Sequence, residues 1–499
     1  MIIDNLKKLK SGTDIRGVAV EADAPVNLTD EAVDVICRAF ATWLGKKYNK
    51  NRFKIAIGND SRISAQRIKD AAANAFLDCG CDVVYTGLSS TPSMFILLKQ
   101  SDFNCGASVM ITASHMPFDR NGLKFFTPDG GLDGKDVDEI LKLAESGELI
   151  TSNTRGSYTE KSFMDKYSAI LVEKVESACG KLPLKGKKII VDAGNGAGGF
   201  FAEKVLKPLG ADTDGSQFLE PDGNFPNHIP NPEDKSAIKS ISKATVKHKA
   251  DLGIIFDTDV DRAACVGPDG EEINRDSLIA LISGILLKEK AGTVVTDSVT
   301  SDGLAEFITA HGGKHLRYMR GYKNVIDKCK ELNENGEYSP LAIETSGHAA
   351  FKENYYLDDG AYLIVKILIS LAQQAKKGES LLSVISDLKK PVEEAEVRLT
   401  FSKKSENFKS EGASVIENLK KTALTDPALT LAPDNYEGVR ISLENGWLLV
   451  RMSVHDPVMP INFASDVQGG NKKNAQLLYN LLSGYEFLDL QNLENFLTL

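Results

Sequence analysis

The chain has 499 residues and a formal net charge of −10. That length exceeds what one hydrophobic core usually supports and favours three or four domains. The acidic balance, without a cluster of Lys or Arg, argues against a protein that binds nucleic acid. The first residues lack the apolar core of a signal peptide, and no stretch approaches the roughly 20 apolar residues of a membrane span. We therefore expect a cytoplasmic protein with no membrane association.

The seven cysteines are scattered along the chain and form no CxxC pair. An odd, scattered set is typical of reduced thiols in a reducing compartment. The seven histidines show no HExxH motif and no spacing typical of zinc ligands. We expect no structural metal.

Short apolar runs that end in polar or glycine-rich turns recur along the chain, and helical patterns such as 31–48 and 67–79 separate many of them. This alternation predicts βαβ units with parallel or mixed sheets. Beyond Pro391 the sequence pattern changes to alternating strand-like segments, with a hairpin turn at 444–446. The predicted fold class is α/β, with three similar α/β domains of mixed sheets and a smaller C-terminal α+β domain.

Three breaks in this pattern suggest where the domains meet. Polar residues fill 146–160 and 267–272, and Lys389-Lys390-Pro391 interrupts the pattern again. We predict four domains, with the bounds 1–152, 153–270, 271–390 and 391–499.

The first loop that suggests chemistry is TASHMPFDRNG, at residues 112–122. The apolar run before it, 107–111, suits a buried strand better than an amphipathic helix. Ser114 lies just past the carboxyl end of that strand, where ligands bind in open α/β sheets. Nearer the N-terminus, SGTDIRG places Arg16 among glycines that allow a ligand to approach closely.

Residues 189–199, IIVDAGNGAGG, have the GxGxxG spacing after a predicted strand. Taken alone, this spacing suggests a dinucleotide site with Asp212 or Asp214 as the ribose-binding acid. The match stands nearly 190 residues into the chain, and no second strand that would carry the acid is evident. We favour a tight strand-to-helix turn.

An acidic loop follows the next strong strand pattern, in the segment IIFDTDVDR. Asp257, Asp259 and Asp261 stand at alternate positions and would repel one another unless a cation intervened. Hard oxygen ligands on a tight loop suit Mg²⁺, whereas the alternatives are a solvated acidic turn or a calcium loop. Arg262 follows directly and suits a second anionic group, or balances the carboxylates.

Two later loops place polar residues after strand-like runs. In LAIETSGH, Glu344, Ser346 and His348 can exchange hydrogen bonds with vicinal hydroxyls, the alternative being a capping loop. RMSVHDP combines a guanidinium, hydroxyl and imidazole, from Arg451, Ser453 and His455. Such a set suits a phosphate cradle, the alternative being a surface turn.

Together these loops resemble a known family. TASHMPFDRNG is similar to the phosphoserine loop of the α-D-phosphohexomutase superfamily, and DTDVDR to its magnesium loop. ETSGH resembles its sugar-recognition loop, and RMSVHDP its phosphate-binding loop. The motifs stand in the family's order across essentially the whole chain. The resemblance implies four domains around a central active-site cleft, which carry in turn the phosphoserine, magnesium, sugar-recognition and phosphate-binding loops.

The resemblance also implies an activity, that of an isomerase which interconverts the 1-phosphate and 6-phosphate of glucose or mannose. Ser114 would carry the phosphoryl group beside Mg²⁺ held by Ser114 itself and the three aspartates. A hexose 1,6-bisphosphate would be both intermediate and activator. Arg16 and Lys124 would neutralise charge, and His115, Lys124 and His348 are candidates for the base. The implied partner is a phosphosugar substrate, and no protein partner is implied.

The resemblance assigns substrate binding to eight residues. Glu344 and Ser346 would hold sugar hydroxyls, and three residues of RMSVHDP would hold the phosphate that is not reacting. The complete set is Arg262, Tyr322, Lys323, Glu344, Ser346, Arg451, Ser453 and His455.

The chain departs from the family's pattern at several sugar-facing or phosphate-facing positions. Val299 stands where a lysine is frequent, and RGYK at 320–323 replaces a TGH-like stretch, with Tyr322 and Lys323 as the expected compensation. Met116, Val454-His455 and Asp456 also differ. An aminosugar phosphomutase, a phosphosugar phosphatase that uses the same serine and a non-catalytic phosphosugar-binding paralogue remain as alternatives.

Overall fold

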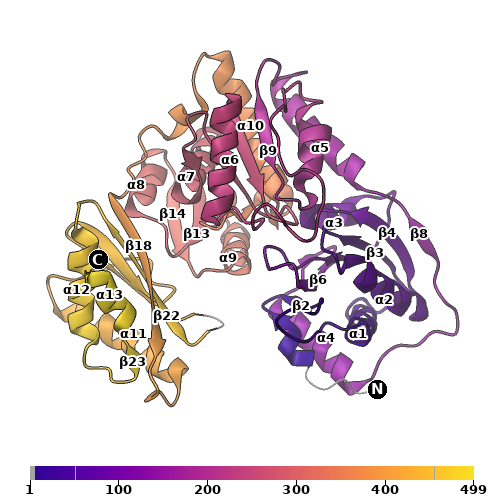
Figure 1. Cartoon of the computed structure of the whole chain (residues 1–499), viewed down its shortest axis with the longest axis horizontal. Helices are drawn as coiled ribbons and strands as arrows, with labels where there is room; N and C mark the ends of the chain where they lie inside the picture. Colours follow the sequence, from indigo (N-terminus) through magenta and orange to yellow (C-terminus); the bar gives the residue numbers. More distant parts are fainter. Residues whose placement is uncertain (1–5, 51, 454–455, 499) are drawn as a thin grey trace. The chain divides into compact units, whose positions relative to one another are not determined.

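The alternating apolar runs form four β-sheets in the computed structural model, which describes residues 6–50, 52–453 and 456–498 (Figure 1). The described residues divide into two compact units. The first unit contains the chain up to Asn274, with Ser346–Ala350 and Leu357–Leu381. The second unit contains Arg275–Thr345, Phe351–Tyr356 and the chain from Leu382 onward. The predicted division into four domains therefore stays a prediction.

The first sheet of the first unit is mixed. Its strands are ordered β1-β2-β6-β5-β3-β4-β8, with β7 paired to β6. β3 pairs in parallel with β4 and β5, whereas β6 is antiparallel to β2 and β5. The strand bounds are β1 Lys10–Ser11, β2 Asp14–Val18, β3 Lys54–Asn59, β4 Asp82–Leu88, β5 Ala107–Ile111, β6 Arg120–Thr127, β7 Gly130–Gly131 and β8 Tyr158–Glu160.

Helices cover this sheet and bury an aromatic core. They are α1 Asp30–Tyr48, α2 Ala65–Asp78, α3 Thr91–Ile96 and α4 Gly134–Ser146. The Thr29 side chain accepts from the Ala32 N–H at the start of α1, and Asp133 forms a capping box at the start of α4. Phe40, Phe76 and Phe125 meet in the core.

The second sheet of the first unit has the order β12-β11-β10-β9. Its strands are β9 Ile189–Asp192, β10 Leu252–Phe256, β11 Ala263–Val266 and β12 Glu272–Ile273, and its helices include α5 Met164–Cys179 and α6 Lys235–His248. A later helix, α10 (Gly360–Lys376), also belongs to this unit and packs on α5. The Tyr167 hydroxyl donates to Asp359 at 2.7 Å, just before α10 begins.

In the second unit, β13 (Thr293–Asp297) pairs in parallel with β14 (Lys314–Tyr318) and β15 (Leu341–Ile343). The accompanying helices are α7 Arg275–Glu289, α8 Asp302–Ala310 and α9 Tyr322–Glu334. Two short strands follow β15 along the chain: β16 (Ala349–Phe351), whose first two residues belong to the first unit, and β17 (Leu357–Asp358), which belongs to the first unit throughout.

The C-terminal part of the second unit is an antiparallel sheet ordered β19-β20-β21-β22-β18-β23. Its strands are β18 Glu393–Phe401, β19 Thr430–Leu431, β20 Val439–Leu443, β21 Gly446–Val450, β22 Val458–Ser465 and β23 Leu488–Asp489, and its helices are α11 Phe408–Thr425, α12 Gly470–Leu482 and α13 Gln491–Thr498. Leu443 pairs with Gly446 across the predicted hairpin turn. The mixed sheets and this C-terminal sheet confirm the predicted fold class.

Among the described helices, none is both long enough and apolar enough to cross a membrane.

Candidate active site

The loop that follows β5 holds Ser114 in an unusual backbone conformation. Ser114 has φ +50°, in the left-handed region, and is only 3% exposed. Its N–H donates to Thr112 Oγ1 at 2.9 Å, and the Thr112 hydroxyl donates to Asp60 Oδ2 at 2.6 Å. A non-glycine residue in this region costs of order 1–3 kcal/mol and persists only where its surroundings enforce it.

Arg62 makes many of the contacts that hold Ser114 in this conformation. Its buried guanidinium donates to the backbone carbonyls of Ser114, Met116, Pro117 and Arg120, the last three at 2.6–2.8 Å. Arg62 therefore ties down four carbonyls of the serine loop with one side chain. We did not predict this role from the sequence, although GNDSR directly follows a strand-like run.

Asp60 completes this support. Its carboxylate accepts from the Arg62 N–H at 3.0 Å and pairs with Arg62 Nε at 3.3 Å. Burial raises the pKa of the Asp60 carboxyl to about 6, against the lowering effects of Arg62 and Thr112.

The acidic loop after β10 brings three buried carboxylates together. One ligand oxygen from each of Asp257, Asp259 and Asp261 lies within 4.8 Å of the others. Val260, between two of them, is buried and has φ +65°, which is a rare conformation for a β-branched residue. The loop thus holds a strained backbone at the point where its carboxylates converge.

The donor set fits a divalent cation. Asp259 Oδ1 and Asp261 Oδ1 are buried and have no hydrogen-bond partner among the described residues. Burial raises the pKa of Asp257 well above its usual value, and the neighbouring carboxylates of Asp261 and Asp259 raise it further. Clustered carboxylate oxygens with unused lone pairs are the ligands that Mg²⁺ takes.

The serine loop and the acidic loop meet. Ser114 Oγ lies 3.1 Å from Asp257 Oδ2. The Thr91 hydroxyl donates to Asp259 Oδ2 at 2.5 Å, and its N–H donates to the Asp259 carbonyl at 2.8 Å. The nucleophile candidate and the metal-ligand candidates therefore form one cluster inside the first unit.

Two cations neutralise part of this negative charge. Lys124, from β6, lies 2.9 Å from Asp259 Oδ2 and 2.6 Å from Asp261 Oδ2. Although burial acts to lower it, these two carboxylates raise the pKa of Lys124 well above its usual value. Arg262 Nε lies 3.2 Å from Asp257 Oδ2.

Arg16 lies on β2, where it pairs in register with Gly122 of β6. Its guanidinium forms an ion pair with Asp14 at 2.8 Å. The positive charge of Arg16 also acts to lower the pKa of Lys124 and of His115.

Two histidines approach the cluster in neutral form. His115 Nδ1 lies 3.4 Å from Ser114 Oγ, and burial followed by the charges of Arg262 and Arg16 lowers the pKa of His115 to about 3. His348 Nε2 lies 4.0 Å from Asp261 Oδ1, and burial lowers its pKa to about 3. Both imidazoles are therefore unprotonated at neutral pH.

The other predicted site residues divide between the two units. Ser346 belongs to the first unit, where its hydroxyl bonds with His348 Nδ1 at 2.8 Å. Glu344, Tyr322, Lys323, Arg451 and Ser453 belong to the second unit, and His455 lies outside the described residues. Lys323 Nζ pairs with Asp327 one turn along α9, at 2.7 Å.

The glycine-rich segment serves the acidic loop. A Cβ on Gly196 would lie 2.7 Å from the Thr258 carbonyl oxygen, so only glycine allows this approach. Asp192, ahead of the turn, accepts from Gly194 N–H at 2.9 Å and from His228 at 3.0 Å. These contacts support our reading of the segment as a strand-to-helix turn rather than a dinucleotide site.

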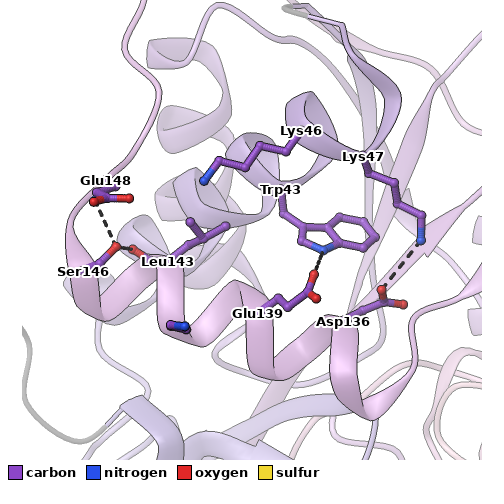
Figure 2. A pocket seen from close by; sticks show the side chains of 9 residues that line it. Trp43, Lys46, Lys47, Asp136, Glu139, Leu143, Ser146 and Glu148 are labelled. Carbon is purple, nitrogen blue, oxygen red and sulfur yellow. Dashed lines mark hydrogen bonds and ion pairs between the residues drawn. The ribbon is translucent and has the colours of Figure 1, made fainter.

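A cavity of about 740 Å³ lies away from these loops, between α1 and α4 (Figure 2). The Trp43 indole donates to Glu139 at 2.9 Å, and Lys47 lies 3.7 Å from Asp136. These pairings satisfy polar groups of the wall, in contrast to the unpartnered carboxylate oxygens of Asp259 and Asp261.

Family models match the chain in three consecutive parts. They describe the phosphoglucomutase/phosphomannomutase alpha/beta/alpha domains I, II and III, and match residues 7–150, 163–270 and 274–388. The chain is 31% identical over 458 residues to a phosphoglucomutase of Neisseria gonorrhoeae, covering 91% of this chain and 92% of that protein.

Further relatives extend this similarity. A phosphomannomutase/phosphoglucomutase of Pseudomonas aeruginosa is 28% identical over 443 residues, covering 87% of this chain and 89% of that protein. The crystal structure of a phosphoglucomutase/phosphomannomutase family protein from Burkholderia thailandensis superposes with a TM-score of 0.80 at 27% identity, covering 95% of this chain and 96% of that one. The chain belongs to the phosphoglucomutase/phosphomannomutase family of the α-D-phosphohexomutase superfamily and is an intramolecular phosphotransferase of the isomerase type.

Proposed function

We propose that this enzyme interconverts hexose 1-phosphates and hexose 6-phosphates with Ser114 as the phosphoryl carrier. The observation that carries the proposal is the contact of Ser114 Oγ with Asp257, 3.1 Å away, inside a cluster of buried carboxylates that fits a divalent cation. Glucose and mannose phosphates are the first substrates to test, because relatives carry the names phosphoglucomutase and phosphomannomutase/phosphoglucomutase. A cytoplasmic location, which we expect from the sequence, is part of the proposal.

The reaction begins with a phosphoryl group on Ser114. A free hydroxyl of the sugar monophosphate attacks phosphorus, so that a new sugar O–P bond forms as the Ser114 Oγ–P bond breaks. The resulting hexose 1,6-bisphosphate then returns its other phosphoryl group to Ser114. The cycle ends with Ser114 phosphorylated again. The bisphosphate acts as an activator because it phosphorylates a Ser114 that has lost its phosphoryl group.

Each side chain of the cluster has a place in this scheme. Asp257, Asp259 and Asp261 would hold Mg²⁺, which when bound neutralises charge on the transferring phosphoryl group. Lys124 and Arg16 add fixed positive charge. The neutral imidazole of His348 or His115 would accept the proton that leaves the sugar hydroxyl.

The remaining predicted residues would bind the sugar. Glu344 and Ser346 would accept and donate hydrogen bonds to hydroxyls, as carboxylate and hydroxyl groups do in small polar sites. Arg451, Ser453 and His455 would hold the phosphate that is not reacting, with Arg262, Tyr322 and Lys323 as further contacts. The four predicted domains, 1–152, 153–270, 271–390 and 391–499, would each supply one loop.

The test is an assay with glucose 1-phosphate, Mg²⁺ and a trace of glucose 1,6-bisphosphate, following glucose 6-phosphate. Mannose 1-phosphate and glucosamine 1-phosphate are run in parallel, and Ser114→Ala is the control. Turnover that disappears in Ser114→Ala is the expected result. Released inorganic phosphate without isomer product would instead identify a phosphatase and overturn the proposal.

A further inference from the structure

Three successive backbone carbonyls of the acidic loop accept hydrogen bonds from three separate segments of the first unit. The carbonyl before Asp259 accepts from the Ala197 N–H at 2.8 Å, and the carbonyl after it accepts from the Gly360 N–H at 3.0 Å. The Asp259 carbonyl itself accepts from the Thr91 N–H at 2.8 Å. The backbone of the loop is therefore held by segments that are distant in sequence, and Thr91 belongs to one of them.

Thr91 can make this contact because it begins helix α3. Ser90 caps the helix, and Pro92 follows Thr91 in its first turn. The N–H groups of a first helical turn have no partner within the helix, so the Thr91 N–H is available to a carbonyl outside it. Thr91 is also buried, with only 4% of its surface exposed. Both its N–H and its hydroxyl donate to Asp259.

The carboxylate of Asp259 has one oxygen in use and one without a partner. Its Oδ2 accepts from the Thr91 hydroxyl at 2.5 Å and from Lys124 Nζ at 2.9 Å. A carboxylate oxygen has two lone pairs, so these two donors occupy both. Oδ1 is buried and has no hydrogen-bond partner among the described residues. Asp259 can therefore offer a cation one oxygen, unless one of the two donors is displaced.

The number of oxygens that a carboxylate offers distinguishes two divalent cations. Ca²⁺ takes roughly six to eight oxygen ligands and often binds both oxygens of a carboxylate, whereas Mg²⁺ requires near-ideal octahedral geometry. A carboxylate restricted to one oxygen suits Mg²⁺ and withholds a ligand from Ca²⁺. The contacts of Asp259 thus favour Mg²⁺ over the calcium loop that the sequence left as an alternative.

We propose that Thr91 is a positioning residue that sets the cation selectivity of this site, because its hydroxyl restricts Asp259 to one ligand oxygen. Lys124 makes the second contact with the same oxygen, but its charge also neutralises the carboxylates. Thr91 is therefore the partner whose contact can be removed without a change in charge. This inference rests on the proposed function, because it concerns the cation of the same site.

The test is isothermal titration calorimetry of the purified enzyme with MgCl₂ and, separately, with CaCl₂, which does not depend on turnover. Thr91→Val removes the hydroxyl but keeps the N–H that holds the Asp259 carbonyl. We expect Mg²⁺ to bind about 10- to 100-fold more weakly, as is typical when a metal ligand loses its hydrogen-bond partner. The affinity for Ca²⁺ should fall by a smaller factor, because the released oxygen becomes a further ligand for Ca²⁺.

Two further variants separate the hydroxyl from a general effect on the fold. Thr91→Ser keeps a hydroxyl and should retain the native preference for Mg²⁺ over Ca²⁺. Thr245→Val is the matched control, because Thr245 is a buried threonine of α6 whose hydroxyl donates to the Ile241 carbonyl at 2.8 Å and not to the acidic loop. Its affinities for both cations should equal those of the native enzyme. Thermal unfolding in EDTA verifies that each variant is folded.

Two results would overturn the inference. One is a Thr91→Val variant that binds Mg²⁺ as tightly as the native enzyme does. The other is a loss of Mg²⁺ and Ca²⁺ affinity by the same factor, which would restrict Thr91 to holding the loop. Failure of the proposed function has a different signature, since Mg²⁺ binding would still depend on Thr91 while the native enzyme failed to isomerise glucose 1-phosphate.

Discussion

At the scale of single residues, the proposed chemistry depends on how Ser114 is held. The left-handed backbone of Ser114 is held by a carbonyl clamp, which we define as the contacts of Arg62 with the carbonyls of Ser114, Met116, Pro117 and Arg120. Phosphoryl transfer requires alignment more than covalent participation by the protein. We therefore propose that the clamp positions Ser114 for the proposed reaction.

Arg62→Lys tests this role. A lysine keeps the charge but cannot reach four carbonyls at once, so we expect kcat to fall about 10- to 100-fold, with a smaller change in KM. Urea unfolding should show a loss of about 1–3 kcal/mol. The matched control is Arg67→Lys, since Arg67 also binds two backbone carbonyls, of Ala19 and Leu28, but away from the serine loop. Equal kcat values for the two variants would contradict the positioning role.

At the same scale, the pair of His228 and Asp192 makes a pH-dependent contribution to the free energy of unfolding. Burial acts to lower the pKa of His228, but the hydrogen bond and charge of Asp192 raise it above the usual 6.5. A histidine with a raised pKa stabilises the fold fully below its unfolded pKa, and this contribution is lost as pH rises through the folded value.

We therefore expect His228→Gln to lower the free energy of unfolding by about 1–3 kcal/mol at pH 5.5, and by less at pH 9. Urea unfolding of the native protein and the variant at both pH values measures the difference. An equal difference in the free energy of unfolding between the native protein and His228→Gln at both pH values would contradict a raised pKa of His228.

At the scale of elements, the candidate site lies on loops that follow buried strands, and contacts with a neighbouring turn hold these loops in place. The serine and acidic loops both follow strands whose residues are buried throughout, β5 and β10. The glycine-rich turn after β9 then packs on the acidic loop, where the Ala197 N–H donates to the Thr258 carbonyl at 2.8 Å. Close backbone contact between two turns is thus part of the candidate metal site.

Gly196→Ala tests this contact. The new Cβ would lie 2.7 Å from the Thr258 carbonyl oxygen and 2.8 Å from its Cα, and backbone atoms yield little. We expect a loss of about 1–3 kcal/mol in urea unfolding and weaker activation by Mg²⁺. Gly484→Ala is the control, because its Cβ would meet no atom within 4 Å. Normal stability in Gly196→Ala would refute the packing argument.

Much of this element-level picture could be predicted from the sequence. Apolar runs that end shortly before Ser114 and directly before Asp257 identify strand ends, and the spacing of three aspartates identifies a candidate metal loop. The clamp of Arg62 could not be predicted in this way, because its carbonyl partners lie more than 50 residues away and present no side-chain signal.

At the scale of the whole molecule, chain order and spatial grouping differ. The segments Ser346–Ala350 and Leu357–Leu381 join the first unit although the residues around them belong to the second. His348 thereby reaches the acidic loop, where Arg262 and His348 form an isolated β-bridge. Periodicity in the sequence cannot reveal that a segment packs into an earlier unit. It indicates which residues are buried, but not which part of the chain covers them.

Metal binding should stabilise the unit that contains the acidic loop. An ion that binds only the folded chain adds RT ln(1 + [L]/Kd), about 2.7 kcal/mol at 100 times Kd. We expect Mg²⁺ to raise the unfolding temperature of the native protein and EDTA to abolish turnover. Asp259→Asn should lose the Mg²⁺ shift, whereas Asp214→Asn, at an exposed aspartate, should keep it. A Mg²⁺ shift that survives in Asp259→Asn would place the ion elsewhere.

The phosphoryl group on Ser114 is the central claim and allows the most direct measurement. The purified enzyme is incubated with Mg²⁺ and glucose 1,6-bisphosphate, digested, and examined by mass spectrometry before and after addition of glucose 1-phosphate in excess. We predict phosphate on the peptide that contains Ser114, turnover of glucose 1-phosphate by that form, and neither in Ser114→Ala. Phosphate on another residue, or isomerisation that persists in Ser114→Ala, would contradict the account.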